Sequence, residues 1–294
     1  MLERVFKHVI KMEGKPDIIY AHYLYNIVNA TNLKEKYDIP LVGIEHWSML
    51  NQSHLSSKTY YLGNIAYPKS DRILAVSNTL AKSIQKNFRI NATVVYNMLG
   101  CEFLNHQNVN KTKESNSFKF VAIGSLLPVK GFDILVNAFN KAKLREKNCR
   151  LVIIGEGKEK NKLQQQINSL SLSNYISLVG RKTKQEIISI LDGADAFVLS
   201  SHSETFSVVC IEAMALGLPV VATRCGGPEE FITNEIGQLV QSGDVDALAE
   251  GMNDMYNNYD MYNRNNIRKI CIRKFAPEVI AQQLTSIFDE VVSK

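Results

Sequence analysis

Two glutamates stand eight residues apart in the segment SSHSETFSVVCIEAMALGLP, residues 200–219. Glu204 follows an apolar run that is typical of a strand, and Glu212 lies inside a helix that the pattern predicts from about Phe206. Eight helical residues span about 12 Å, so the two carboxylates are too far apart to act as one acid–base pair. The spacing suits hydroxyl-rich groups at the two ends of an elongated ligand, such as a nucleotide sugar. Periodicity alone favours a plainer interpretation, in which Glu204 caps the helix and Glu212 is solvated.

The start of this helix and a lysine elsewhere in the chain are candidates for holding phosphate. A helix N-terminus presents unpaired N–H groups and a partial positive charge. In VAIGSLLPVKGFDI, residues 121–134, an apolar strand leads to Gly124, a short loop and Lys130, and Gly131 opens the next helix. A lysine at such a junction can neutralise a diphosphate without a metal. The alternative is a turn closed by Gly131 with Lys130 exposed, and this motif alone does not decide between them.

His46 comes directly after the apolar run of LVGIEHWS, residues 41–48. Open α/β sheets bind ligands at the carboxyl ends of their strands, so a functional and a structural role for His46 are about equally supported.

Other nucleotide-binding and hydrolase motifs are not supported. IIGEGKEK, residues 153–160, has Lys160 where a dinucleotide fingerprint needs its third glycine, so we interpret Gly155 and Gly157 as parts of a tight turn. GxxxxGK[ST], HExxH and GxSxG motifs do not occur in the sequence, so P-loop, zinc-hydrolase and serine-hydrolase chemistry lack support.

Short apolar runs alternate with amphipathic segments along the chain, which indicates parallel sheets covered by helices. The pattern predicts strands at residues 17–21, 41–45, 72–76, 93–96, 119–124, 150–155, 176–180, 196–200, 219–222 and 237–240. It predicts helices near residues 23–37, 58–67, 78–88, 131–145, 158–170, 184–192, 208–216 and 245–256. The tail from Tyr259 is predicted to form two helices that are separated at Pro277.

A polar segment without periodicity, NHQNVNKTKESNS (105–117), divides these elements into two groups, and within it the linker is predicted at residues 106–117. Residues 118–276 then form a complete doubly wound domain of about six strands. Residues 1–105 form a Rossmann-like domain with about four strands. This first domain thus has fewer strands than the second, and it opens with a helix.

Composition narrows the class of protein. The 294 residues are 45% hydrophobic and 21% charged, which excludes disordered and low-complexity chains. The net charge of +5 is too small to indicate nucleic-acid binding. The excess of positive charge lies mostly in residues 1–105, which suits an anionic partner or membrane surface, or an ordinary solvated face.

Five scattered cysteines without a CxxC pair indicate reduced thiols in a cytoplasmic protein. The sequence shows neither a signal peptide nor an apolar run of about 18 residues.

The three candidate segments together resemble the family 4 glycosyltransferases, which are retaining enzymes of the GT-B fold. SETFSVVCIEAMALGLPVVAT (203–223) is similar to that family's signature, GSLLPVKGFDIL (124–135) to its diphosphate loop, and IEHW (44–47) to its histidine segment. GGPEEFI (226–232) and YNMLG (96–100) fit weaker positions. The resemblance implies two Rossmann-like domains that face a cleft, with residues 277–294 packing back on the first domain. Such enzymes normally begin with a strand and a glycine-bearing loop, so the resemblance also implies that the first domain is incomplete and lacks its initial strands.

The resemblance also implies a role for each candidate residue. Glu204 would hold hydroxyls of the donor sugar, Glu212 the ribose diol and Lys130 the diphosphate, while His46 would face the reacting sugar and the acceptor. Further donor contacts would come from Arg181 near the base and from the segment that opens the helix, namely Thr205, Phe206, Ser207 and Val208. Ser125 stands where the family often has an arginine, which removes one charge from the diphosphate loop. No metal or other cofactor is expected, because basic groups and a helix terminus stabilise the leaving diphosphate.

The implied activity is transfer of a hexose from a UDP- or GDP-sugar to a glycan or lipid-linked acceptor, in the synthesis of a cell-surface polysaccharide such as capsule or lipopolysaccharide. The implied setting is cytoplasmic, with peripheral contact to the inner membrane face. Two alternatives stay open. One is a catalytically inactive protein that binds nucleotide sugars, suggested by the incomplete first domain, and the other is a nucleotide-sugar epimerase.

Overall fold

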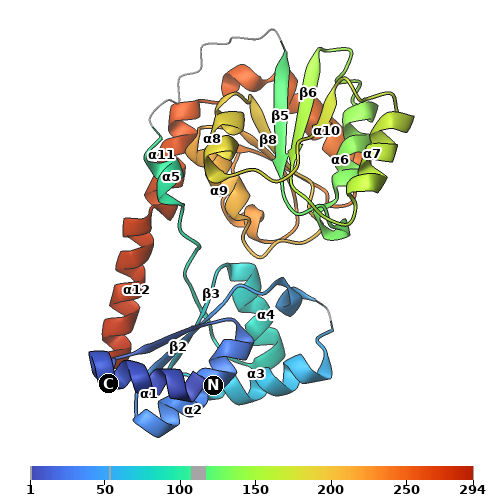
Figure 1. Cartoon of the computed structure of the whole chain (residues 1–294). Coiled ribbons are helices and arrows are strands. Elements are labelled where there is room, and N and C mark those ends of the chain that lie inside the picture. Colours follow the sequence, from blue (N-terminus) through green and yellow to red (C-terminus); the bar gives the residue numbers. More distant parts are fainter. Residues whose placement is uncertain (1, 53, 107–116, 294) are drawn as a thin grey trace. The chain divides into compact units, whose positions relative to one another are not determined.

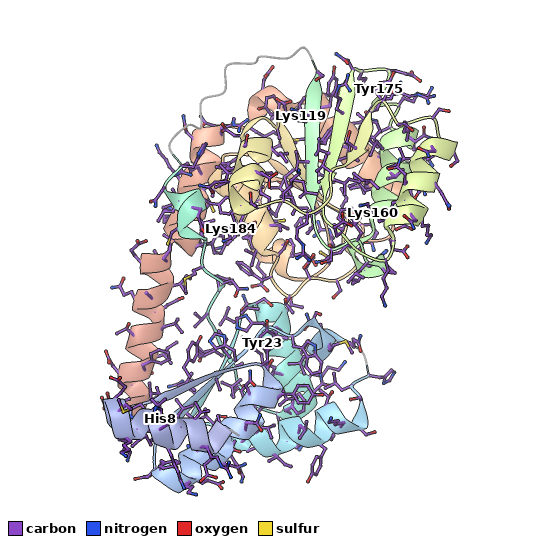
Figure 2. The ribbon with its side chains drawn as sticks, in the orientation of Figure 1. His8, Tyr23, Lys119, Lys160, Tyr175 and Lys184 are labelled. Atoms are coloured by element: carbon purple, nitrogen blue, oxygen red, sulfur yellow. The ribbon has the colours of Figure 1, made fainter. Side chains whose placement is uncertain are left out.

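The computed structural model describes residues 2–52, 54–106 and 117–293. The chain divides into two compact units, of which unit 1 comprises residues 1–97 and 278–294 and unit 2 comprises residues 98–277. Each unit contains a parallel sheet with its own covering of helices (Figure 1). Side chains fill the space between each sheet and its helices (Figure 2). The predicted α/β class with two sheets is therefore confirmed.

Unit 1 has a four-stranded sheet in the order β1-β2-β3-β4, and β1 lies at its edge. The strands are β1 (Ile19–His22), β2 (Leu41–Glu45), β3 (Arg72–Ala75) and β4 (Thr93–Val94). The other elements are α1 (Leu2–Glu13), α2 (Leu24–Tyr37), the 3₁₀ helix η1 (Ser48–Asn51), α3 (Ser57–Lys69), α4 (Asn78–Phe88) and α12 (Pro277–Val292). All four predicted strands form.

The central strand β2 is buried along its whole length. Gly43 in this strand makes room for its neighbours, because a Cβ there would lie 2.7 Å from Ile27 Cδ1 of α2. Helix α4 begins where the sequence predicts, since the Ser77 hydroxyl accepts a hydrogen bond from the Leu80 N–H at 3.1 Å. The sheet thus presents the residues after β2, including His46, at its carboxyl edge.

Unit 2 has a six-stranded parallel sheet in the order β10-β9-β8-β5-β6-β7. The strands are β5 (Phe118–Ile123), β6 (Cys149–Ile154), β7 (Ile176–Leu178), β8 (Ala196–Leu199), β9 (Val220–Thr223) and β10 (Gly237–Val240). The longer helices are α6 (Phe132–Lys141), α7 (Lys160–Ser169), α8 (Lys184–Asp192), α9 (Val208–Ala215), α10 (Val245–Asn257) and α11 (Arg264–Phe275). Short helices are α5 (Cys101–Leu104), η2 (Pro128–Lys130), η3 (Gly227–Glu230) and η4 (Tyr259–Met261). The six predicted strands and the doubly wound pattern are present.

The core of unit 2 lies between the sheet and the helices α6, α7 and α10, whose apolar side chains pack against alternate residues of the strands. Alternation places Phe120 and Ala122 of β5 on this face, as the two-residue period of a strand requires. On the opposite face α9 packs against β8, β9 and α11. Helix α9 is buried nearly all round, which matches its uniformly apolar sequence.

The division between the units differs from the predicted boundary at residue 105. Residues 98–104 belong to unit 2 because α11 holds them there: the Arg268 guanidinium donates hydrogen bonds to the carbonyls of Phe103 and Leu104, at 3.3 and 2.6 Å. The Leu99 N–H also donates to the Phe275 carbonyl at 2.8 Å. The predicted linker, 106–117, lies almost entirely outside the described residues.

The last helix, α12, starts at Pro277, where the sequence predicts a break from α11. Residues 278–294 group with unit 1. The Phe288 ring packs edge-on against Tyr20 of β1 at a centroid distance of 5.1 Å, and Glu290 forms an ion pair with Arg72 of β3 at 3.1 Å. Across the described part of the chain, every helix is too short or too polar to traverse a lipid bilayer.

Candidate active site

The main candidate site lies at the carboxyl edge of the sheet in unit 2. Strand β5 pairs with β6 on one side and with β8 on the other, so the strand order reverses between β5 and β8. Loops that leave the sheet at such a reversal diverge and leave room for a ligand. Lys130 follows β5 and Glu204 follows β8, so the topology brings these two predicted residues to the same place.

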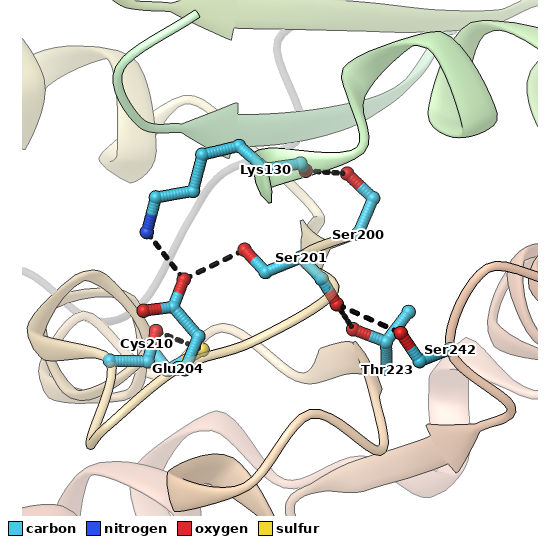
Figure 3. A network of polar contacts seen from close by, with 8 residues as sticks. Lys130, Ser200, Ser201, Glu204, Cys210, Thr223 and Ser242 are labelled. Carbon is cyan, nitrogen blue, oxygen red and sulfur yellow. Dashed lines mark hydrogen bonds and ion pairs between the residues drawn. The ribbon is translucent and has the colours of Figure 1, made fainter. Parts of the chain in front are cut away.

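Glu204 and Lys130 form an ion pair there, with Lys130 Nζ 2.6 Å from Glu204 Oε1 (Figure 3). The same carboxylate oxygen accepts a hydrogen bond from the Ser201 hydroxyl at 2.7 Å. The Glu204 residue is only 8% exposed. A buried carboxylate needs such partners, because desolvation of an unpaired charge is costly. Ser201 is a site residue that the sequence argument missed, although its position three residues before Glu204 was the available signal.

Backbone contacts fix the loop that carries Glu204. The Glu204 N–H donates to the Cys225 carbonyl at 2.8 Å, and the Gly227 N–H donates to the Glu204 carbonyl at 3.1 Å. The Ser201 carbonyl accepts from the hydroxyls of Thr223 and Ser242, at 2.5 and 3.3 Å (Figure 3). These bonds extend the sheet locally past β8 and β9, so the carboxylate is held on a rigid support rather than on a mobile loop.

The Lys130 loop is anchored to the same support. The Ser200 hydroxyl donates to the Lys130 carbonyl at 2.8 Å, and the His202 N–H donates to the Val129 carbonyl at 2.8 Å. Gly131 has a φ of +60°, and a Cβ there would lie 2.3 Å from the Ser200 carbonyl oxygen. Glycine at this position therefore allows the two loops to approach closely.

The helix that follows Glu204 begins at Val208, as the predicted helix over residues 208–216 requires, and Phe206 lies in the loop before it. Ser207 has a φ of 77°, its side chain does not cap the helix, and the first turn of the helix carries no acidic residue. Its terminal N–H groups are therefore suited to an anionic ligand. The Phe206 side chain is buried against Phe231 and Phe275, so this residue can offer only its backbone. Thr205 lies beside it in the same loop, and Val208 is partly exposed at the start of the helix.

Glu212 lies in the second turn of α9. Burial raises the pKa of the Glu212 carboxyl to about 7, an effect that Lys184 opposes and that Glu102 reinforces. Lys184 and Glu102 themselves form an ion pair at 3.5 Å. Among the described residues, none hydrogen-bonds to the Glu212 carboxylate. This half-buried acceptor can therefore bind a hydroxyl-bearing ligand.

Ser125 and Arg181 follow β5 and β7 at the same edge of the sheet, and both are exposed. Gly155 and Gly157 lie against the Ser125 loop, a contact that the turn interpretation did not include. A Cβ on Gly155 would lie 1.8 Å from the Gly124 carbonyl oxygen, and one on Gly157 would lie 2.4 Å from that of Leu126. Among the residues described, we find no group of three or more His, Cys, Asp or Glu side chains that could hold a metal ion.

His46 belongs to unit 1, at the carboxyl edge of its own sheet. Its Nε2 lies 3.1 Å from Nδ1 of His22, and the two rings are stacked with an interplanar angle of 4°. Burial, with a contribution from His22, lowers the pKa of His46 to about 4, while a hydrogen bond with Asn97 opposes the shift. His46 is therefore neutral at pH 7, and its imidazole can both donate and accept a hydrogen bond.

The residues around His46 were not predicted. His22 ends β1, and the motif YAHY gave only a weak signal for it. Glu45, next to His46, is fully buried and accepts a hydrogen bond from the Tyr67 hydroxyl at 2.9 Å. Burial raises the pKa of Glu45 to about 7. A buried acid beneath His46 could not be inferred from the apolar pattern of the strand.

Two family models match the chain. The model for glycosyl transferases group 1 matches residues 105–270, more than half of the chain, and the model for Glycosyltransferase Family 4 matches residues 2–102. The chain is a family 4 glycosyltransferase. Its Lys130–Glu204 pair and Glu212 all lie within the part that matches the group 1 model.

Characterised and uncharacterised glycosyltransferases are among the relatives of this family 4 glycosyltransferase. An uncharacterized glycosyltransferase of Methanocaldococcus jannaschii is 31% identical over 88% of this chain and 70% of its own length. The capsular polysaccharide biosynthesis glycosyltransferase CapM of Staphylococcus aureus is 26% identical over 78% of this chain and 64% of its own length. The chain spans 54% of a second M. jannaschii glycosyltransferase.

Solved structures establish the fold of the glycosyltransferase. The Anabaena protein HepE, in complex with UDP, superposes with a TM-score of 0.85 at 22% identity, over 98% of this chain and 82% of HepE. Sucrose-phosphate synthase from Thermosynechococcus elongatus superposes with a TM-score of 0.86 at 18% identity, over 99% of this chain and 77% of the synthase. The GT-B fold that the sequence resemblance implied is confirmed.

Proposed function

We propose that this glycosyltransferase moves a hexose from a UDP- or GDP-linked donor to a glycan or lipid-linked acceptor, with retention of anomeric configuration. The observation that carries the proposal is the Lys130–Glu204 pair, 2.6 Å apart, at the sheet reversal and next to the uncapped N-terminus of α9. A cation and a helix terminus suit a diphosphate, and a fixed carboxylate suits sugar hydroxyls. HepE, which shares the fold, is solved with UDP and with UDP-glucose.

In the proposed donor complex the diphosphate lies between Lys130 and the first N–H groups of α9, contributed by residues 206–208. Ser125 lines the same loop, Arg181 lies near the base, and Thr205 flanks Glu204. Glu204 accepts hydrogen bonds from hydroxyls of the hexose, and Glu212 accepts hydrogen bonds from hydroxyls of the ribose. These groups replace a metal in stabilising the charge that develops on the leaving diphosphate.

The proposed reaction breaks the bond between the anomeric carbon and the phosphate oxygen and forms a bond from the acceptor oxygen on the same face. The acceptor hydroxyl gives its proton to the leaving phosphate oxygen. The neutral imidazole of His46 would hydrogen-bond to hydroxyls of the reacting sugar or the acceptor. Similarity to CapM, a capsular polysaccharide biosynthesis glycosyltransferase, favours a cell-surface polysaccharide as the product.

Calorimetric titration with UDP, GDP and ADP tests the donor site. We expect one nucleotide to bind, and Glu212→Ala to weaken it about 10- to 100-fold, because hydrogen bonds to a charged group are lost. Glu250→Ala, which removes an exposed carboxylate from α10, is the matched control and is expected to leave affinity unchanged. Equal affinities in the wild type and in Glu212→Ala would contradict the ribose assignment.

The raised pKa of Glu212 adds a pH dependence to the same experiment. Below a pKa of about 7 the carboxyl is mostly protonated and is a weaker acceptor, so nucleotide affinity should rise between pH 6 and pH 8. The terminal phosphate of the nucleotide also titrates in this range. Glu212→Gln keeps the phosphate titration and removes that of residue 212, so its affinity should change less with pH than that of the wild type.

Donor turnover distinguishes the proposed transferase from the two alternatives. Release of nucleotide from a UDP- or GDP-sugar, with the sugar transferred to an acceptor or to water, supports the transferase. An epimerised donor in the absence of acceptor would indicate an epimerase. Nucleotide binding without turnover of any donor would indicate an inactive binding protein.

A further inference from the structure

Aromatic side chains gather beside His46 at the carboxyl edge of the sheet in unit 1. The rings of Tyr20, His22, His46 and Tyr23 form a row, with successive centroids 4.6, 5.2 and 5.1 Å apart. A further pair, Tyr25 and Trp47, lies 5.7 Å apart. Tyr23 and Tyr25 come from the start of α2, and His46 and Trp47 come from the residues after β2. We name Tyr23, Tyr25 and Trp47 the aromatic shelf.

The shelf is not part of the hydrophobic core. Tyr23 is 46% exposed and Tyr25 is 44% exposed, whereas the core residue Leu24 between them is fully buried. Figure 2 shows where the Tyr23 side chain lies in unit 1. Exposed aromatic side chains that lie together next to a candidate catalytic residue are typical of a recognition surface.

Tyr23 also has an unfavourable backbone conformation, with φ 67° and ψ 146°. Asp38 and Arg89 have positive φ as well, but their ψ angles of 59° and 29° lie in the left-handed region that other residues tolerate. The conformation of Tyr23 lies outside that region and is close to one that glycine alone adopts readily. Its N–H donates to the Ile44 carbonyl at 2.9 Å, so the strand next to it fixes this geometry.

The fold by itself gives no reason for a tyrosine at this position. A glycine would adopt the backbone conformation without strain, and the exposed ring adds little to the core. Strain that is retained at an exposed aromatic residue beside an active site is explained by a contact with a ligand. The candidate donor groups all lie in unit 2, whereas Tyr23 lies in unit 1.

We propose that the aromatic shelf binds a pyranose ring of the acceptor by stacking, so that the acceptor is a carbohydrate at the point of contact. The proposal rests on the proposed transferase function. The C–H face of a sugar ring is apolar and packs on aromatic rings, while its hydroxyls require polar partners close by. Tyr23 supplies a ring with a hydroxyl, and the imidazoles of His22 and His46 supply donors and acceptors next to it. A lipid tail has no polar groups that could pair with this hydroxyl and these imidazoles.

Trp47 is the only tryptophan in the sequence, so its fluorescence reports directly on the shelf. We would titrate the full chain with methyl glucoside, methyl galactoside, methyl mannoside and N-acetylglucosamine at millimolar concentrations. At least one sugar should change the emission and saturate. Tyr23→Ala should raise its dissociation constant about 3- to 10-fold, which corresponds to the loss of one ring contact. Because alanine keeps the same backbone strain, this variant isolates the role of the ring.

Tyr61→Ala is the matched control, because Tyr61 on α3 is 66% exposed and lies outside the shelf. It should leave the dissociation constant unchanged. The proposal is overturned if none of the sugars changes the emission, or if Tyr61→Ala and Tyr23→Ala weaken binding equally. Lys58 Nζ lies 5.5 Å from the centre of the Tyr25 ring and could attract anionic headgroups. A response to phosphatidylglycerol vesicles without a response to sugars would therefore assign the shelf to a membrane and also overturn the proposal.

Failure of the shelf and failure of the proposed function give different results. UDP or GDP affinity, measured by calorimetry, should be the same in the wild type and in Tyr23→Ala. If sugars bind to the shelf and no nucleotide binds to the wild type, the donor assignment fails and the shelf stands. If a nucleotide binds and no sugar does, the shelf fails and the donor assignment stands.

Discussion

Glu45 and Glu204 are both buried carboxyls that follow or end a parallel strand, yet their surroundings are opposite. Glu204 faces the Lys130 ammonium at 2.6 Å and a serine hydroxyl. Among the described residues, Glu45 has no cation beside it: Tyr67 donates to one carboxylate oxygen, and the other, Oε2, has no hydrogen-bond partner. Burial consequently raises the pKa of Glu45 to about 7. The two buried carboxyls thus differ in their partners: Glu204 has a cation beside it, and the pKa of Glu45 is raised by burial.

Glu45→Gln should reduce the pH dependence of the stability of unit 1. The pKa of Glu45 rises from 4.5 to about 7 on folding, so between these values the folded chain holds more protons than the unfolded chain. The free energy of unfolding must then fall as pH rises from 5 to 8, by about 2–3 kcal/mol for this group. Glutamine can still accept from Tyr67 but does not ionise, so this decrease should disappear.

Urea unfolding followed by Trp47 fluorescence measures this effect, because Trp47 lies in unit 1. Glu250→Gln, an exposed site in unit 2, should retain the pH dependence of the wild type. A Glu45→Gln protein that loses as much stability as the wild type between pH 5 and pH 8 would show that Glu45 ionises normally.

At the scale of elements, glycines control how closely the loops of unit 2 approach one another. Gly131 joins η2 to α6 and lies against the Ser200 carbonyl at the end of β8. Gly227 similarly allows η3 to pack on the loop before α9, since a Cβ there would lie 2.4 Å from Phe206 Cα. The Lys130–Glu204 distance therefore depends on the backbone fit of the two loops as well as on the charges.

Gly131→Ala should destabilise unit 2 and weaken nucleotide binding together. Alanine is unfavourable at φ +60°, and its Cβ would meet the Ser200 carbonyl oxygen at 2.3 Å, so the expected cost is about 2 kcal/mol or more. Gly193→Ala is the control, because φ there is −76° and a Cβ would meet Ser189 at an ordinary 3.6 Å. Thermal unfolding and UDP or GDP titration of both variants test the idea, and equal behaviour of the two would refute it.

At the scale of the whole molecule, the two units are not two consecutive stretches of chain. Unit 1 is completed by residues 278–294, which come after the whole of unit 2. Within unit 1, α12 contributes the Phe288 ring against Tyr20 and the Glu290 carboxylate to Arg72. The edge strand β1 is thereby supported by a helix from the other end of the sequence.

Phe288→Ala should loosen unit 1 and leave unit 2 unchanged. Removing a half-buried aromatic ring costs about 1–2 kcal/mol, so amide hydrogens of β1 should exchange about tenfold faster or more. Amides of β5 in unit 2 should keep their exchange rates. Met261→Ala, at a residue that is 81% exposed in unit 2, is the control. Faster exchange of the β5 amides, or unchanged exchange of the β1 amides, would show that α12 does not act by stabilising the first sheet.

Local sequence patterns are enough to predict the helices and strands and to single out the segments that carry Lys130 and Glu204. All ten predicted strands form, and the break at Pro277 is where the pattern placed it. The segments with Lys130 and Glu204 identified the family before any geometry was known. This succeeds because periods of two and 3.6 residues, and the glycines and prolines that interrupt them, are properties of neighbouring residues.

Which side chains lie in contact, and which of them have strained backbones or shifted pKa values, depends on the tertiary structure. Lys130 and Glu204 are 74 residues apart and pair because β5 and β8 are adjacent in the sheet, an order that no local pattern encodes. The stacking of His22 on His46, the strained Tyr23 and the raised pKa of Glu212 depend in the same way on sheet order and burial. The unit boundary at residue 97 follows from Arg268, more than 160 residues further along the chain. Contacts between distant residues depend on how the elements pack, which is a property of the whole fold.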